Sequence, residues 1–180
     1  PSDNVIFLRS HSKWGRNLGR RLAWVEAPSS VVEVMESFHS STILSPDMLH
    51  QLAMTIFIER ALANGSLKKY VKASRLLYES AAREMMFSIE SELGFKTLSP
   101  KGGLYTCMHV EMDGARFVRE VLKHAEVLFV PGYGFGGTLK RAVRVSFGPL
   151  VNDVSQIKEG IERVGKVIPK FSEARRKRVS

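Results

Sequence analysis

The stretch that decides how this chain is interpreted is SHSKWGRNLGRRLAW, residues 10–24. Its lysine, Lys13, lies among small hydroxyl residues, shortly after the apolar run at residues 5–8. A short continuous apolar run predicts a strand that is buried on both faces. Loops at the ends of such strands hold the reactive groups of many α/β proteins. We therefore examine Lys13 as a candidate functional residue.

The residue types in this loop fit a ligand that carries an aldehyde and a phosphate. Cationic neighbours favour the neutral, nucleophilic form of a lysine amine, which forms an imine with an aldehyde. Ser10 and Ser12 supply hydroxyl donors, and Arg21 supplies a planar fork that matches phosphate oxygens. On these residues alone, a solvated basic loop explains the stretch at least as well.

In its order of residues, the stretch resembles the lysine signature of the pyridoxal-phosphate-dependent aminotransferases of class I/II, which have fold type I. That family reads Ser-x-Ser-Lys, a glycine-bearing loop, and then Gly-x-Arg-apolar-Gly before an aromatic residue. The resemblance implies that Lys13 binds the cofactor, pyridoxal 5'-phosphate, covalently. It also implies that Ser10, Ser12 and Arg21 hold the cofactor phosphate.

The chain departs from the signature at four positions. An apolar or aromatic residue is usual where the chain has His11, and smaller or apolar residues are usual at Arg16 and Asn17. Ala23 replaces the glycine, which is a mild change. These departures leave the substrate and the reaction open more than the cofactor.

A second match lies at residues 141–147, Arg-Ala-Val-Arg-Val-Ser-Phe. Strand alternation predicts that Ala142, Arg144 and Ser146 share one face, so that Arg144 has small neighbours and room to reach a ligand. Taken alone, Arg144 is an ordinary surface arginine of a strand. The segment resembles the late strand of the same family, and the resemblance implies that Arg144 binds the substrate carboxylate bidentately.

Two weaker similarities support the match. Residues 130–136 are similar to the Pro-Gly-x-x-Phe-Gly loop that precedes the arginine strand, and residues 101–105 resemble the Gly-Gly turn of the small domain. The glycine loop does not fit dinucleotide binding, because a strand follows it rather than a helix. For Tyr133 and Phe135, packing and a functional role both stay open.

Capping residues and periodicity predict the elements. Helices are expected from a capping box at Ser30 and Glu33, from Ser45-Pro46, from Asp113 to residue 124, and from residues 152–153 to 168. Residues 67–93 keep one apolar stripe, which predicts a helix on the order of 40 Å long. Strands are expected at residues 95–98, 104–110, 127–130 and 142–147.

The resemblance assigns these elements to an α/β fold: the end of the large mixed-sheet cofactor domain, a long connecting helix and the α+β C-terminal small domain of a fold-type I aminotransferase. The expected regions are 1–65 for the C-terminal part of the large cofactor-binding domain and 66–94 for the connecting helix. Residues 95–168 are expected to form the small domain, and residues 169–180 a basic tail.

The composition excludes several classes of protein. Hydrophobic residues make up 44% and charged residues 25% of 180, which is typical of a globular chain rather than a disordered one. No apolar run approaches the ~20 residues of a membrane helix, and the single cysteine, Cys107, indicates a reducing compartment. We expect a cytoplasmic protein. The five histidines lack metal-ligand spacing, so no metal site is expected.

The net charge of +9 is ambiguous. It can indicate nucleic acid, an acidic membrane or an anionic ligand. The sequence lacks a surface that interleaves aromatic and basic residues, so we do not favour a nucleic-acid-binding domain.

Together the matches imply an amino-acid aminotransferase that acts on an amino acid and a 2-oxo acid, as a homodimer. The resemblance covers only the C-terminal half of the family's fold, so we expect this piece to be inactive without the N-terminal half. Two alternatives stay open: another fold-type I enzyme, such as a lyase or decarboxylase, and the aminotransferase-like domain of a transcription regulator.

Overall fold

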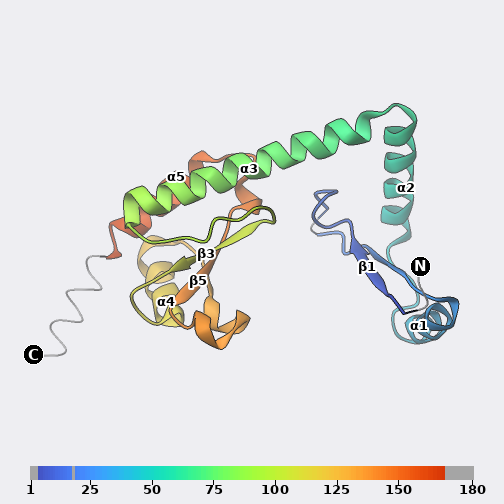
Figure 1. The fold of residues 1–180 in the computed structure, drawn as a ribbon, viewed down its shortest axis with the longest axis horizontal. Helices are drawn as coiled ribbons and strands as arrows, with labels where there is room; N and C mark the ends of the chain where they lie inside the picture. The colour runs from blue at the N-terminus through green and yellow to red at the C-terminus, as the bar shows by residue number, and fades with distance from the viewer. Residues whose placement is uncertain (1–3, 18, 169–180) are drawn as a thin grey trace, which may run out of the picture. The chain divides into compact units, whose positions relative to one another are not determined.

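The computed structural model of the protein describes residues 4–17 and 19–168 (Figure 1). The expected basic tail, residues 169–180, lies outside the described residues. The chain divides into two compact units, Pro1–Ser74 and Arg75–Ser180, called unit 1 and unit 2 below. This boundary falls inside the segment expected to connect two domains, and the four regions given above remain a prediction.

Unit 1 contains a two-stranded sheet, two helices and the beginning of a third. Strands β1 (Phe7–Ser10) and β2 (Ala23–Glu26) pair antiparallel, with Ser10 opposite Ala23. The expectation that the first strand is buried on both faces is wrong for this chain: Phe7 is 42% exposed and Leu8 77%. The reason is that a two-stranded sheet, β1–β2, offers the strand no layer on either side.

Both helix starts expected in unit 1 are displaced. Helix α1 (Ser29–Thr42) has Pro28 as its N-cap and no side-chain cap, so Ser30 lies inside the first turn and the predicted capping box does not form. Helix α2 (Met48–Ala63) begins two residues after Pro46, because the side chain of Asp47 accepts a hydrogen bond from the backbone N–H of His50. Asp47 is therefore the N-cap of α2, in place of the serine expected at position 45.

The long helix is present as predicted. Helix α3 (Ser66–Leu93) runs for 28 residues (Figure 1). Asn64 accepts a hydrogen bond from the backbone N–H of Ser66 at 2.9 Å, and Gly94 ends the helix in the left-handed region at φ +64°. Only glycine adopts that conformation without steric cost, which explains a glycine at this C-terminal position.

Unit 2 packs helices on one three-stranded antiparallel sheet. Strands β3 (Tyr105–His109) and β4 (Val130–Pro131) pair on either side of β5 (Ala142–Ser146). Helices α4 (Gly114–Ala125) and α5 (Ser155–Gly165) and the last turns of α3 enclose its core. The most deeply buried large side chains of this core are Phe117, Phe147, Ile89, Met108, Ile157 and Ile161.

Two strands expected in unit 2 are shorter than predicted. Residues 95–98 form one bridge, Thr97 opposite Met108, and run beside β3 through backbone bonds from Leu98 to Cys107 and from His109 to Lys96. The strand expected at 127–130 is reduced to β4. Its continuation is two short 3₁₀ helices, η1 (Gly132–Phe135) and η2 (Gly137–Leu139), because the glycine loop turns before it reaches β5.

The last helix also differs from its prediction. It begins at Ser155 rather than at residues 152–153, and α5 ends at Gly165. Asp153 still serves the first turn, because its carboxylate accepts bonds from the backbone N–H of Ser155 and the side chain of Gln156. The N-cap itself is Val154, which has no side-chain capping bond, so the predicted Asn152-Asp153 cap is wrong at the N-cap position and Asp153 acts from one residue before it.

Candidate functional site

The candidate residues form two groups, and each group lies within one unit. Ser10, Ser12, Lys13 and Arg21 belong to the loop that joins β1 to β2 in unit 1, which we call the lysine loop, residues 10–22. Arg144 lies on β5 in unit 2.

Lys13 lies in a tight turn at the end of β1. His11 donates its backbone N–H to the carbonyl of Leu22, which extends the strand pairing by one step. Gly15 then donates to the carbonyl of His11 at 3.1 Å, and Arg16 donates to the carbonyl of Lys13 at 3.2 Å. The turn exposes Lys13, two residues beyond His11, where the strand pairing ends.

Gly15 allows this turn to close. A Cβ atom at Gly15 would lie 2.9 Å from the carbonyl oxygen of His11, closer than side chains are found to approach. The hydroxyl of Tyr70, on α3, donates to the carbonyl of Gly15 at 3.1 Å. The long helix therefore fixes the lysine loop from outside, through a residue 55 positions later in the chain.

The two serines of the signature lie together. The Ser10 and Ser12 hydroxyl oxygens are 3.0 Å apart, and Ser12 also donates its backbone N–H to the Ser10 oxygen at 3.1 Å. Arg21 adopts a left-handed backbone conformation, φ 53°, just before Leu22, the residue that pairs with His11. Clustered hydroxyl donors beside cationic residues suit a phosphate, so the residues present fit the phosphate end of pyridoxal phosphate.

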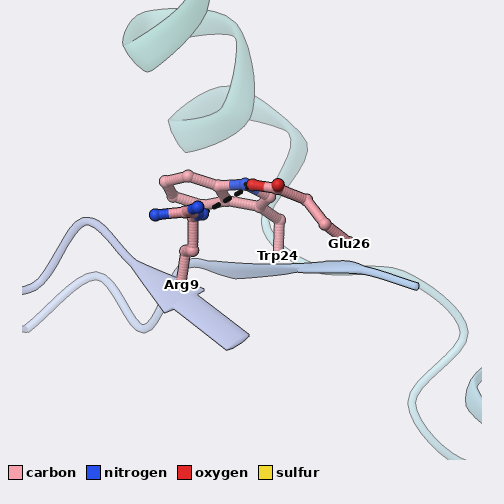
Figure 2. A network of polar contacts seen from close by, with 3 residues as sticks. All are labelled: Arg9, Trp24 and Glu26. Atoms are coloured by element: carbon pink, nitrogen blue, oxygen red, sulfur yellow. Dashed lines mark hydrogen bonds and ion pairs between the residues drawn. The ribbon is translucent and has the colours of Figure 1, made fainter. Parts of the chain in front are cut away.

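A surface network fastens the two strands below this loop (Figure 2). Arg9 and Trp24 are opposite each other in the strand register, and both donate to one oxygen of Glu26, at 2.6 and 3.1 Å. The charge of Arg9 is thereby compensated by Glu26. At this exposure the ion pair stabilises the fold by about 1 kcal/mol at most.

His11 is the residue of this loop whose surroundings depart most from the sequence expectation. It is 8% exposed, and its ring centroid lies 4.6 Å from the ring of Trp24 and 5.1 Å from that of Trp14. Burial, and secondarily the charge of His50, lowers the pKa of His11 below its usual 6.5. The sequence marked His11 as a departure from the signature, but nothing local to it predicted a buried aromatic cluster.

Arg144 occupies the middle of the central strand of unit 2. Its register partners are Cys107 on β3 and Val130 on β4. Its neighbours Val143 and Val145 are buried in the core, while Arg144 itself is half-buried. The alternation predicted for this strand therefore holds at these three positions.

Two aromatic rings surround the Arg144 guanidinium. Its carbon lies 4.5 Å from the ring centroid of Tyr105 and 5.1 Å from that of Phe135. Among the described residues, no carboxylate pairs with it, and its Nε atom is buried without a hydrogen-bond partner. A half-buried cation with aromatic neighbours and no counter-ion within the described chain is suited to receive an anion.

Sequence reasoning did not identify this aromatic environment. The sequence indicated Tyr105 only as part of a turn motif. For Phe135 it left both packing and a functional role open. The signal available in the sequence was the spacing of Tyr105 on β3, which alternation places on the same face as Cys107, the register partner of Arg144. Only the strand order of the sheet shows that both rings flank one arginine.

Two further features concern other kinds of site. In the part of the chain that the structure describes, no group of three His, Cys, Asp or Glu side chains is arranged to hold a metal ion. None of the described helices is both long and apolar enough to span a bilayer.

One family profile covers the residues of both groups. The family profile described as aminotransferase class I and II matches residues 1–164. Among curated proteins, (5-formylfuran-3-yl)methyl phosphate transaminase of Methanocaldococcus jannaschii is 24% identical over 171 residues, or 93% of this chain and 43% of the relative. Aspartate aminotransferase of Pyrococcus abyssi is 28% identical over 165 residues, or 90% of this chain and 41% of the relative. The chain thus spans about two fifths of the length of these relatives.

Solved structures give the same fold. α-Aminoadipate aminotransferase LysN of Thermus thermophilus, complexed with N-(5'-phosphopyridoxyl)-L-leucine, matches with a TM-score of 0.82 at 23% identity, over 96% of this chain and 43% of that one. Aromatic aminotransferase of Pyrococcus horikoshii matches with a TM-score of 0.81 at 26% identity, over 94% and 44%. The expected fold class is confirmed. With most of its length matched by the family profile, the chain belongs to the aminotransferase class I and II family.

Proposed function

We propose that this chain is the C-terminal part of a pyridoxal 5'-phosphate-dependent amino-acid aminotransferase. The observation that carries the proposal is the lysine loop: Lys13 follows two serine hydroxyls 3.0 Å apart, in a turn closed by Gly15. The names of the similar proteins, which act as aminotransferases, support the same reaction class. The substrates are an amino acid and a 2-oxo acid.

Residues of this chain would bind the cofactor, transfer a proton and bind the substrate carboxylate. The hydroxyls of Ser10 and Ser12 and the guanidinium of Arg21 would hold the cofactor phosphate, and Lys13 would hold the end of the cofactor that carries the aldehyde. When bound, the cofactor supplies the electron sink for the substrate α-carbon. Once the substrate amino group has taken its place, the free amine of Lys13 would accept the α-proton at Nζ as general base and return it, and Arg144 would hold the α-carboxylate of the substrate.

The remaining parts of the proposal follow from the family. The complete enzyme would include the part of the fold that this chain does not cover, would act as a homodimer and would reside in the cytoplasm. This chain alone would be inactive, since it spans about two fifths of its relatives. A lyase or decarboxylase reaction of the same fold type would use Lys13 and Arg144 as well, and product analysis separates these reactions.

Covalent labelling of the full-length protein tests the role of Lys13. Borohydride reduction of the cofactor-loaded protein, followed by peptide mapping, should place the label on Lys13. Lys13→Ala should lose the label and at least about a hundredfold in rate, because both the attachment point and the general base are removed. Lys69→Ala, an exposed lysine of the same unit, is the control and should keep both. Label on a different lysine would overturn the assignment.

Arg144 should affect substrate binding and not the cofactor. Removing it leaves a desolvated carboxylate unpaired, at a cost of about 2–4 kcal/mol, so Arg144→Ala should weaken amino-acid binding about 30- to 1000-fold with an unchanged cofactor spectrum. Arg119→Ala, an exposed arginine on α4, is the matched control. Equal losses for the amino acid and its decarboxylated amine would show that Arg144 does not bind the carboxylate. Formation of a 2-oxo acid, without release of CO₂, identifies transamination.

A further inference from the structure

The two rings near Arg144 come from opposite sides of its strand. Tyr105 is the first residue of β3, and its register partner, Ser146, lies two residues beyond Arg144 on β5. Phe135 ends η1, the short helix that follows β4, and β4 pairs with the other edge of β5. Because the sheet order is β3-β5-β4, one aromatic residue reaches Arg144 from β3 and the other from the 3₁₀ helix that follows β4.

Neither ring serves the hydrophobic core. Tyr105 is 39% exposed and Phe135 53%, and both lie outside the core cluster of unit 2 and the residues packed against it. Large exposed aromatic side chains add little to packing, so core stability does not explain these two. Both rings lie against the Arg144 guanidinium.

The guanidinium gains its orientation from these rings. Within the described residues, the guanidinium has no carboxylate partner, and its Nε–H donates no hydrogen bond. The faces of aromatic rings attract a cation electrostatically, and they do so without using any of its N–H donors. The ring contacts therefore do not themselves occupy the Nη donors, through which an arginine binds a carboxylate bidentately.

We propose that Tyr105 and Phe135 form an aromatic clamp that holds the Arg144 guanidinium ready for the substrate carboxylate. The proposal rests on the carboxylate-binding role of Arg144 given above. Both rings are proposed as positioning residues, because they act through Arg144. A long flexible side chain loses rotamer freedom when it binds, and a clamp that orders it beforehand reduces that cost.

Single ring deletions in the cofactor-loaded, full-length protein test the clamp. Tyr105→Leu and Phe135→Leu should each weaken binding of an unreactive carboxylate probe, maleate, about two- to thirtyfold. The KM for the amino acid should rise by the same factor with kcat nearly unchanged, and the KM for the decarboxylated amine should not change. Tyr105→Phe keeps the ring and should keep wild-type affinity. Tyr133→Leu, an exposed tyrosine in the same 3₁₀ helix without a contact to Arg144, is the control.

A second measurement does not depend on activity. Phenylglyoxal modifies accessible guanidinium groups, and peptide mapping reports the rate at Arg144 itself. Deletion of either ring should raise this rate severalfold, while the rate at Arg119 stays constant. Circular dichroism of each variant verifies that the sheet is intact. Phe135 lies at the end of η1, outside the sheet, so Phe135→Leu tests the clamp even where a change on β3 impairs folding.

The outcomes separate the two proposals. If Arg144→Ala weakens maleate binding but neither leucine variant does, the clamp is wrong and the role of Arg144 stands. If Arg144→Ala leaves maleate binding intact, the proposed role of Arg144 fails, and the clamp fails with it. If Tyr105→Phe loses as much affinity as Tyr105→Leu, the hydroxyl rather than the ring acts on Arg144, and the clamp is again wrong.

Discussion

Unit 1 and unit 2 differ in how they bury their apolar residues. In the described part of unit 1, Met54 and Ala61 are the buried apolar residues, and α1 buries none. Unit 2 holds a continuous core that extends from Ala81 to Val167. The first unit therefore has elements without a core, whereas the second has the core of an independent domain.

The difference bears on how each candidate residue is positioned. Arg144 lies on the central strand of a packed sheet, so unit 2 supplies its support. Lys13 lies beside strands whose apolar side chains are exposed, and helix α1 presents Val34 at 70% and Phe38 at 72% exposure. Apolar surface of this extent fits the part of the family fold that this chain, at about two fifths of its relatives' length, does not cover.

The largest expected difference between the two units is in the protection of their backbone amides from hydrogen exchange. In this 180-residue chain, amides of β3 and β5 should exchange at least about a hundredfold more slowly than those of β1 and β2, because an isolated two-stranded sheet is marginally stable. Hydrogen exchange measured by mass spectrometry or NMR gives both rates in one sample. Residues 75–168 prepared alone, which include the turns of α3 that enclose the core, should keep the slow exchange of β3 and β5.

Uniformly slow exchange across residues 5–24 in a proven monomer would contradict this contrast. Such a result would mean that unit 1 is self-sufficient and that its apolar surface has no need of further chain. Concentration-dependent protection in the same region would instead indicate self-association of the exposed strands.

A matched pair of phenylalanines gives the next contrast. Phe117 is 1% exposed in unit 2, and Phe117→Ala should lower the free energy of unfolding by about 3–5 kcal/mol. Phe38, 72% exposed on α1, should change stability by no more than about 0.5 kcal/mol in this chain, since it makes few contacts to lose. Denaturant unfolding, followed separately in each unit by hydrogen exchange, measures both values.

The effect of Phe38→Ala can also be compared between this chain and the full-length protein. There, Phe38→Ala should cost clearly more than in this chain if the missing part of the fold covers α1. Equal small costs in both proteins would show that α1 is a solvent-exposed helix, and the apolar surface of unit 1 would then need another explanation.

The sequence predicted the elements whose signals are local. The stripe of α3 and its end at Gly94 follow from helical periodicity and from a residue that tolerates positive φ. Asp113 was recognised as a cap, and it accepts a bond from the backbone N–H of Arg116 at 2.9 Å. The strand of Arg144 followed from alternation. In each case the deciding interaction lies within a few residues.

Elements that depend on distant partners were less predictable. The apolar run near Phe7 indicated burial, but burial requires neighbouring layers that the described chain lacks. The strand expected at 127–130 is short because pairing with β5 begins only at Val130. The same holds for the candidate site. The sequence indicated the serine-lysine turn, whereas the rings of Tyr105 and Phe135 are brought to Arg144 only by the order of the strands in the sheet.

The smallest contrast concerns pH, and it arises at His11. Burial lowers the pKa of His11 below 6.5, so the unfolded chain binds a proton there at a pH where the folded loop does not. Stability of the lysine loop should therefore be fully present above pH 6.5 and should fall as the pH drops below it, while β3 and β5 of unit 2 change less. Exchange rates of residues 10–24 between pH 7 and 5, corrected for intrinsic exchange, measure the effect. His11→Phe keeps a ring against Trp24 and should flatten this pH dependence, whereas His109→Gln, at an exposed position in unit 2, should preserve it. Wild-type pH dependence in His11→Phe would assign the effect to a different group.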